Sequence, residues 1–96
     1  MPAYLIALEV IKDREEFDKY RAKVHPVLSK YNAEIMVSNE KVEIMEGEWP
    51  YTKTVVIRFP SMELAKRWYE SPEYKEIVQH RFRAATTDLI LVEGRV

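Results

Sequence analysis

The segment from Thr54 to Tyr74 constrains the fold most strongly, because it contains the signals of a strand and of two helices in succession. Residues 54–59 alternate between two faces and are rich in β-branched side chains, which is typical of a strand. Pro60 should end this strand, because proline has no N–H to donate to a neighbouring strand. Ser61 fits the N-cap of a helix, and Ser71-Pro72 repeats such a start signal. The segment therefore predicts a strand followed by two consecutive helices that meet at an angle.

Residues 3–11 also predict a strand, and this strand is apolar on both of its faces, with Glu9 as its single charged residue. The segment from Thr86 to Val92, the last predicted strand, carries leucines on one face and Ile90 and Val92 on the other. A strand with one face in water usually alternates apolar and polar residues. We therefore expect both faces of these two strands to be covered.

A first helix is predicted between these strands. Asp13 and Glu16 form a variant of the capping box, and apolar residues at helical spacing continue as far as Tyr31. Pro26 removes one backbone hydrogen bond and crowds the preceding turn. We expect either a kink near His25 or two abutting helices.

The middle of the chain is less regular. Glu34–Val37 predicts a second strand, and we expect Val42–Glu46 to continue it past a kink at Ser38-Asn39 rather than to return as a hairpin. Gly47–Thr52 is a predicted loop, and the last helix should run from Pro72 to about Ala85.

The resulting order, β-α-β-β-α-β, predicts an α+β fold with an antiparallel sheet. Right-handed crossovers place the helices on one face of the sheet. The other face is apolar too, and a chain of 96 residues has no strands left to cover it. Two copies that pack sheet against sheet solve this problem. We therefore expect one domain, residues 1–96, that forms a homodimer through its sheet faces.

Composition weighs against several classes of function. The chain has 15 basic and 16 acidic residues, so it lacks the basic excess of a typical nucleic-acid-binding protein. It contains no cysteine, which excludes disulfides and fits a reducing compartment. Neither a basic leader nor an uninterrupted apolar run of membrane-spanning length is present. We expect a cytoplasmic protein with no nucleic-acid or membrane partner.

Short motifs spread over nearly all of the chain form a specific set, although each motif alone is weak. They are Met1-Pro2-Ala3-Tyr4, Glu46-Gly47-Glu48-Trp49-Pro50, Phe59-Pro60-Ser61, Ala65, Trp68-Tyr69, Ser71-Pro72-Glu73-Tyr74, Arg81 and Val92-Glu93-Gly94. As a set they resemble the family known as domain of unknown function 1330. The resemblance implies a ferredoxin-like dimeric α+β barrel, and it implies no established activity.

One position departs from the pattern of that family. After the first helix, where the family usually has Gly-Gly, this chain has Asn32-Ala33. Asparagine tolerates the left-handed backbone conformation that a helix C-cap requires. The turn should therefore form as it does in the family.

Arg81 is the first candidate for a functional residue. It lies on the apolar stripe of the last predicted helix, so its guanidinium should be buried and must find a partner. One interpretation is structural: an ion pair with Glu9 or Glu93, or a stem that reaches the surface. The other is a clamp for the carboxylate of a ligand in a cleft between helix and sheet.

Several aromatic residues have two interpretations as well. Tyr20, Tyr31, Trp68 and Tyr69 lie at helical spacing, so they pack in the core or line a pocket beside Arg81. Trp49, in the acidic loop, either packs within its own turn or takes part in ligand binding. In a dimer this loop could reach across to the partner.

The two histidines differ in position. His25, beside Pro26, is a candidate general base or axial haem ligand. His80 falls outside the apolar stripe and is expected in solvent. Because the chain has no cysteine and no histidine pair at ligand spacing, we expect no metal site and no cofactor.

Three functions remain open at this level. The first is a dimeric binding protein for a small molecule that is partly apolar or anionic. The second is a cofactor-independent enzyme of the oxygenase, isomerase or lyase type, with His25, Tyr20 and Arg81 as acid, base and anion-binding groups. The third is a purely structural dimer in which Arg81 only stabilises the fold.

Overall fold

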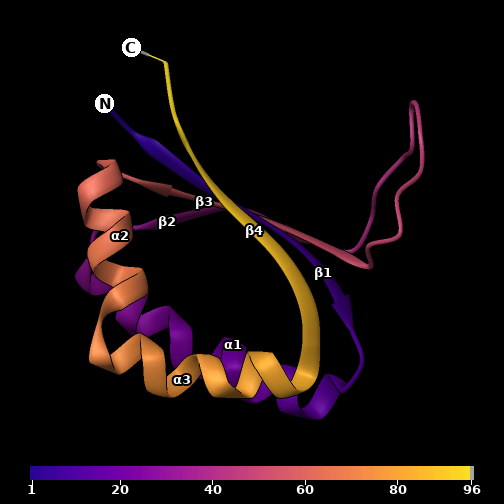
Figure 1. Cartoon of the computed structure of the whole chain (residues 1–96), viewed down its shortest axis with the longest axis horizontal. Helices are drawn as coiled ribbons and strands as arrows, with labels where there is room; N and C mark the ends of the chain where they lie inside the picture. Colours follow the sequence, from indigo (N-terminus) through magenta and orange to yellow (C-terminus); the bar gives the residue numbers. More distant parts are fainter. Residues whose placement is uncertain (96) are drawn as a thin grey trace.

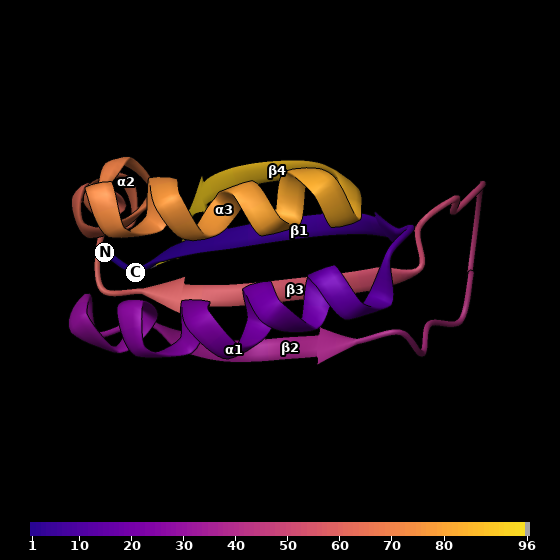
Figure 2. The ribbon, with the colours of Figure 1, turned by 90° about the horizontal axis from the view of Figure 1, so that it is seen from below.

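A computed structural model describes residues 1–95 of the chain. These residues form a four-stranded antiparallel sheet with three helices on one of its faces (Figures 1 and 2). The strand order is β2-β3-β1-β4, so β1 and β3 are central and the other two strands form the edges. In chain order the elements are β1 (Ala3–Ile11), α1 (Arg14–Lys30), β2 (Glu34–Asn39), β3 (Lys53–Phe59), α2 (Met62–Glu70), α3 (Pro72–Ala84) and β4 (Ala85–Glu93).

The predicted order of elements and the placement of the helices on one face are confirmed. Along β1, Ala3, Leu5 and Ala7 are buried beneath the helices, whereas Ile6 and Leu8, which point to the other face, are half-buried. The same alternation continues in β3, so one face of the sheet supplies the hydrophobic core. The core cluster consists of Leu5, Ala7, Val24, Val27, Leu28, Ile57, Phe59, Ala65, Trp68, Tyr74 and Val78.

The helix starts predicted from the sequence are confirmed by their capping bonds. The backbone N–H of Glu16 donates to the Asp13 carboxylate over 3.2 Å, and that of Leu64 donates to the Ser61 hydroxyl over 3.2 Å. Ser71 serves two helices at once. Its hydroxyl donates to the last turn of α2 and accepts from the first turn of α3, which joins the two helices without a loop.

The helix α1 is one continuous helix that contains Pro26, so the alternative of two abutting helices is wrong. Packing of its apolar face on the sheet, through Val24, Val27 and Leu28, offsets the lost backbone bond. The turn after it is confirmed: Asn32 has a φ of 56°, in the left-handed region.

Residues 40–52, which we call the arm, contain no strand, so the prediction that Val42–Glu46 continues the second strand is wrong. The last residue pair between β2 and β3 is Asn39 with Thr54. A longer strand would need the returning segment as its partner, and that segment contains Gly47 and Pro50, which are unfavourable in a strand. The arm instead projects beyond the end of the sheet (Figures 1 and 2).

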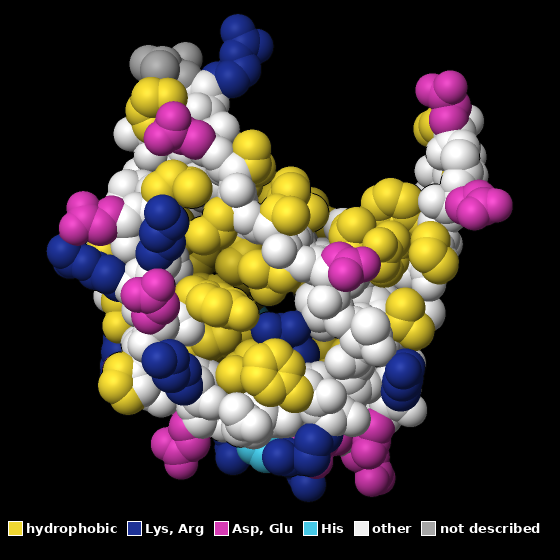
Figure 3. All heavy atoms as spheres, in the orientation of Figure 1, with side chains coloured by type: hydrophobic (Ala, Val, Ile, Leu, Met, Phe, Trp, Pro, Cys, Tyr) yellow, Lys and Arg dark blue, Asp and Glu magenta, His cyan; other side chains and the backbone are white. Residues whose placement is uncertain are grey.

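The face of the sheet opposite the helices, which we call the open face, is largely apolar. Within one chain it leaves Ile90 57%, Val92 44% and Val37 41% exposed. Figure 3 shows hydrophobic side chains gathered in the hollow between the chain termini and the arm. The apolar residues of the open face are Tyr4, Ile6, Leu8, Val10, Val37, Val56, Ile90 and Val92.

The core assignment predicts the effect of shortening Phe59, which is fully buried and whose ring centroid lies 5.4 Å from that of Trp68. Phe59→Ala should lower the free energy of unfolding by about 3–5 kcal/mol, because it removes buried surface and leaves a cavity. Met45→Ala is the control, since Met45 is 86% exposed on the arm and should change stability by less than about 0.5 kcal/mol. Urea unfolding measures both, and equal midpoints for the two variants would contradict this core.

Candidate functional site

A row of three polar residues interrupts the apolar layer between the sheet and the helices. Glu9 of β1 pairs with Lys53 of β3 on one side and with Thr87 of β4 on the other. Glu9 and Lys53 are only 2% and 5% exposed. The Thr87 hydroxyl donates to the Glu9 carboxylate over 3.2 Å. The register of the sheet therefore places an acid and a base side by side in the interior.

Arg81 of α3 faces the same interior and is 5% exposed, so its predicted burial on the helix stripe is confirmed. Its Nη2 donates to the Tyr74 hydroxyl over 3.4 Å. The Tyr74 and Tyr20 hydroxyl groups lie 2.7 Å apart. Among residues 1–95, no carboxylate forms an ion pair with Arg81, so neither Glu9 nor Glu93 is the structural partner considered from the sequence.

Glu9 and Lys53 of the polar row line, together with Arg81, one cavity of about 50 Å³ between the helices and the sheet. Arg21, His25 and Ser38, which also line it, are exposed, so the cavity reaches the surface between α1 and β2. The other lining residues are Leu5, Ala7, Phe17, Tyr20, Val24, Leu28, Ile35, Val55, Ile57, Trp68 and Leu89. The cavity is therefore a mostly apolar chamber with a charged end.

Two residues that line this cavity each carry a buried donor with no partner within residues 1–95. These donors are Nε of Arg81 and the ring nitrogen Nε1 of Trp68, whose ring lies 4.0 Å from that of Tyr74 between centroids. Buried donors are rarely left without an acceptor, because their desolvation costs about 1–3 kcal/mol each. Both groups are therefore free to donate a hydrogen bond.

The burial of these groups changes their acidity. Burial raises the pKa of Glu9 above 4.5, although Arg81 and the bond from Thr87 act in the opposite direction. Burial also lowers the pKa of Lys53 below 10.5, and the charge of Arg21 adds to this effect. Burial raises the pKa of Tyr20 well above 10.0, so its phenol stays protonated. Burial thus shifts the pKa of Glu9 and the pKa of Lys53 in opposite directions, each against the charged form of its own group.

The candidates from the sequence divide into two groups. Arg81, Trp68 and Tyr20 meet at the cavity, and His25 lies at its mouth. Tyr31 packs against the core outside the cavity lining, and Tyr69 is 42% exposed at the border of the buried face of α2.

Trp49 lies on the arm, away from the cavity. Its ring packs 5.3 Å from that of Tyr51, between centroids, and the Tyr51 hydroxyl donates to Asp88 over 2.7 Å. Sequence reasoning missed Lys53 as a cavity residue. It considered Glu9 only as a partner of Arg81, although an isolated charge in a two-sided apolar strand was a usable signal.

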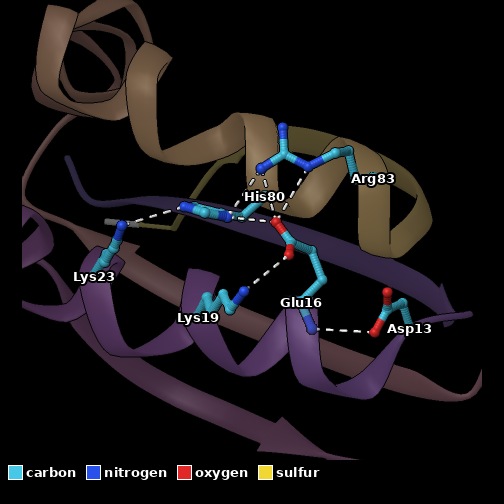
Figure 4. Close-up of polar contacts among 6 residues, drawn as sticks. All are labelled: Asp13, Glu16, Lys19, Lys23, His80 and Arg83. Carbon is cyan, nitrogen blue, oxygen red and sulfur yellow. Dashed lines mark hydrogen bonds and ion pairs between the residues drawn. The ribbon is translucent and has the colours of Figure 1, made fainter.

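A second polar cluster joins α1 to α3 on the outer surface, as Figure 4 shows. Glu16 of α1 accepts from Arg83 over 2.8 Å and lies at hydrogen-bond distance from His80. Lys23 lies 3.3 Å from the other ring nitrogen of His80. The sequence had suggested that His80 is surrounded by solvent. It is instead held between the two helices.

The cluster makes stability depend on pH, because the bonds from His80 and Arg83 lower the pKa of Glu16 from 4.5 to about 2. A lowered pKa in the folded state stabilises the fold above pH 4.5, and this contribution disappears as the pH falls towards 2. Wild-type protein should be more stable than Glu16→Gln at pH 6, and the difference should shrink between pH 4.5 and 2.

Urea unfolding at several pH values measures this difference. Glu15→Gln is the matched control: Glu15 lies in the same helical turn, is exposed, and forms no ion pair within residues 1–95. A gap between wild type and Glu16→Gln that does not change with pH would contradict the role of the cluster.

Solved structures of low sequence identity share this fold. A protein of unknown function from Rhodopseudomonas palustris aligns with a TM-score of 0.84 and 17% identity, over 99% of this chain and 83% of that one. A dimeric ferredoxin-like protein of unknown function from Jannaschia sp. CCS1 aligns with a TM-score of 0.78 and 8% identity, over 98% and 100%. SnoaB, a cofactor-independent oxygenase from Streptomyces nogalater, aligns with a TM-score of 0.70 and 11% identity, over 99% and 94%. The fold is therefore ferredoxin-like.

The sequence shows to which family the chain belongs. The model of the family described as Domain of unknown function (DUF1330) matches residues 2–95, so the chain belongs to this family, as the motifs had predicted. No curated protein matches the sequence. Within residues 1–95, no helix has the length and apolar character needed to span a membrane.

Proposed function

We propose that this protein binds a small, partly apolar monoanion in the cavity beneath Arg81. We also propose that it does so as a homodimer in which each chain forms one domain. The observation that carries the proposal is Arg81 itself: it lines the cavity, is 5% exposed, lacks an ion pair within residues 1–95, and has an unpartnered Nε. A carboxylate is the natural partner, because its two oxygens match the donors of a guanidinium. The unpartnered Nε1 of Trp68 supplies a further donor to such a ligand.

The charge in the cavity supports a single negative charge on the ligand. The buried ionisable groups Glu9, Lys53 and Arg81 carry a net charge of +1 when all are ionised. One bound monoanion makes the chamber neutral, which reduces the cost of burying these charges.

The size of the cavity limits the ligand. A volume of about 50 Å³ holds only a few water-sized groups, since one water needs roughly 10–15 Å³ on the same measure. Leu5, Ala7 and Ile57 on the sheet side provide apolar contacts for a short carbon chain. Short monocarboxylates therefore fit the site better than larger acids.

Replacement of Arg81 tests the proposal. Wild-type protein should show a higher Tm in the presence of propionate, and Arg81→Met should raise the Kd at least tenfold, because a hydrogen bond to a charged group is worth about 1.5–3 kcal/mol. Thermal shift and calorimetry measure these effects. Arg67→Met is the control, because Arg67 is an exposed arginine on α2 that pairs only with Glu63.

The same variant separates binding from a purely structural role. Because Arg81 is a buried charge that forms no ion pair within residues 1–95, Arg81→Met should leave stability unchanged or raise it in the absence of ligand. A loss of several kcal/mol together with no detectable binding by wild-type protein would instead support the structural interpretation. Unchanged propionate affinity in Arg81→Met would exclude the clamp.

A cofactor-independent enzyme acting on such a ligand is the second candidate. It is favoured by Glu9, Tyr20 and Arg81, which bring a carboxyl, a phenol and a cation to one chamber, and by the similarly folded SnoaB, which is a cofactor-independent oxygenase. His25 at the mouth lies on the entry route of a substrate rather than beside the polar row.

The homodimer is supported by the open face and by the similar structures that are dimeric. Large contiguous apolar patches on a protein surface usually mark an interface. Two open faces related by a twofold axis can pack as a sheet sandwich and remove these side chains from water.

A charged residue on the open face should disrupt this dimer. Ile90→Lys should convert a particle of two chains into one of a single chain at micromolar concentration, because a lysine would be buried between the sheets. Phe82→Lys is the matched control, since Phe82 has the same 57% exposure but lies on α3, on the helix side. Light scattering after size-exclusion chromatography measures both. A wild-type mass of one chain would refute the dimer.

A further inference from the structure

Lys53 is an unusual lysine, because its amine lies in the interior without a carboxylate partner. The residue is 5% exposed, and its Nζ lies 5.3 Å from the centroid of the Phe17 ring. Its direct neighbour across the sheet is Glu9, yet the two form no ion pair in residues 1–95. Lysines are almost never buried in this way unless they are paired.

The surroundings of Lys53 act on its charge in two directions. The face of the Phe17 ring, whose centroid lies 5.3 Å from Nζ, attracts the charged amine. Burial and the charge of Arg21 nevertheless lower the pKa of Lys53. Glu9 and Glu40 act in the opposite direction but do not cancel the effect. A desolvated lysine near another cation is the arrangement in which an amine becomes a nucleophile towards carbonyl groups.

We propose that Lys53 forms an imine with the carbonyl group of a short oxo acid whose carboxylate is bound by Arg81. This inference rests on the proposed function, because Arg81 and Lys53 line the same cavity and the anion would place the carbonyl group beside the amine. It narrows the ligand from short monocarboxylates to those with a reactive carbonyl, of the size of glyoxylate or pyruvate.

The chemistry balances without a cofactor. The lone pair of Nζ attacks the carbonyl carbon, a C–N bond forms, and the electron pair of the C=O bond moves to oxygen. The nitrogen gives up one proton and the oxygen takes up one, so that a hydroxyl forms. Loss of that hydroxyl as water leaves the imine, so amine and carbonyl give imine and one water.

Glu9 is placed to carry the protons of this reaction. Residues opposite each other on one face of an antiparallel pair have Cβ atoms about 4.5–5.5 Å apart, so the carboxyl of Glu9 is within reach of groups bound to Lys53. In its protonated form Glu9 donates to the leaving hydroxyl and then takes back the proton from nitrogen. Thr87 holds the carboxyl in place by its bond to Oε2.

Reductive trapping tests the proposal. Wild-type protein is incubated with pyruvate and sodium cyanoborohydride, which reduces an imine to a stable secondary amine. Intact mass spectrometry should show one carboxyethyl group per chain, and peptide mapping should place most of it on Lys53. Lys53→Arg keeps the positive charge and should lose this adduct, whereas Lys75→Arg, which removes an exposed lysine of α3, should keep it.

A second pair of measurements separates this inference from the proposed function. Arg81→Met should form much less adduct with pyruvate but should react with acetaldehyde, which has no carboxylate, as fast as wild type. If pyruvate binds by calorimetry and no adduct forms on Lys53, the imine is excluded while anion binding stands. If adduct is spread evenly over the exposed lysines, or if pyruvate neither binds nor reacts, the inference is wrong.

Discussion

The structure depends on the central strand β1, which is hydrogen-bonded along both of its edges. It pairs with β3 from Ala3 to Glu9 and with β4 from Ala3 to Ile11. Because both neighbours are fixed, each side chain of β1 points either to the layer under the helices or to the open face. The β1 side chains under the helices are apolar from Ala3 to Ala7, and the next one is Glu9. The alternation of one strand therefore defines the core, the polar row and the open face at once.

The charged groups of the cavity are costly for a small domain. A chain of 96 residues has a limited core, and its net stability is expected to be only about 5–15 kcal/mol. Buried charges without ion pairs usually destabilise a fold relative to apolar residues of the same size. Glu9, Lys53 and Arg81 are buried without such pairs among residues 1–95. Stability alone does not explain them, whereas the proposed binding of an anion would.

Local signals in the sequence were enough for most of the fold. Asp13, Ser61 and Ser71 cap the helices as expected, since capping depends on residues within one turn. Asn32 adopts the left-handed conformation that its side chain tolerates. The burial of Arg81 followed from helical periodicity alone.

Features that depend on distant parts of the chain could not be predicted in the same way. Lys53 sits at the first position of β3, where periodicity is weakest, and only the pairing register brings it beside Glu9. The arm looked like a strand because Val42 and Ile44 alternate with polar residues, but a strand also needs a partner, and the returning segment provides none. Tyr69 has the helical spacing of a core residue and yet lies at the border of the buried face.

The two faces of the sheet are linked through the same strands. On β1, Leu8 and Val10 point to the open face and Glu9, between them, points to the cavity. On β3, Thr54 points to the open face and its neighbour Lys53 points to the cavity. A second copy packed on the open face would restrain the backbone at both positions and so hold the acid and the amine in register. Substitutions on the helix side would leave that interface unchanged, so proteins that share one dimer can differ in the chemistry of the cavity.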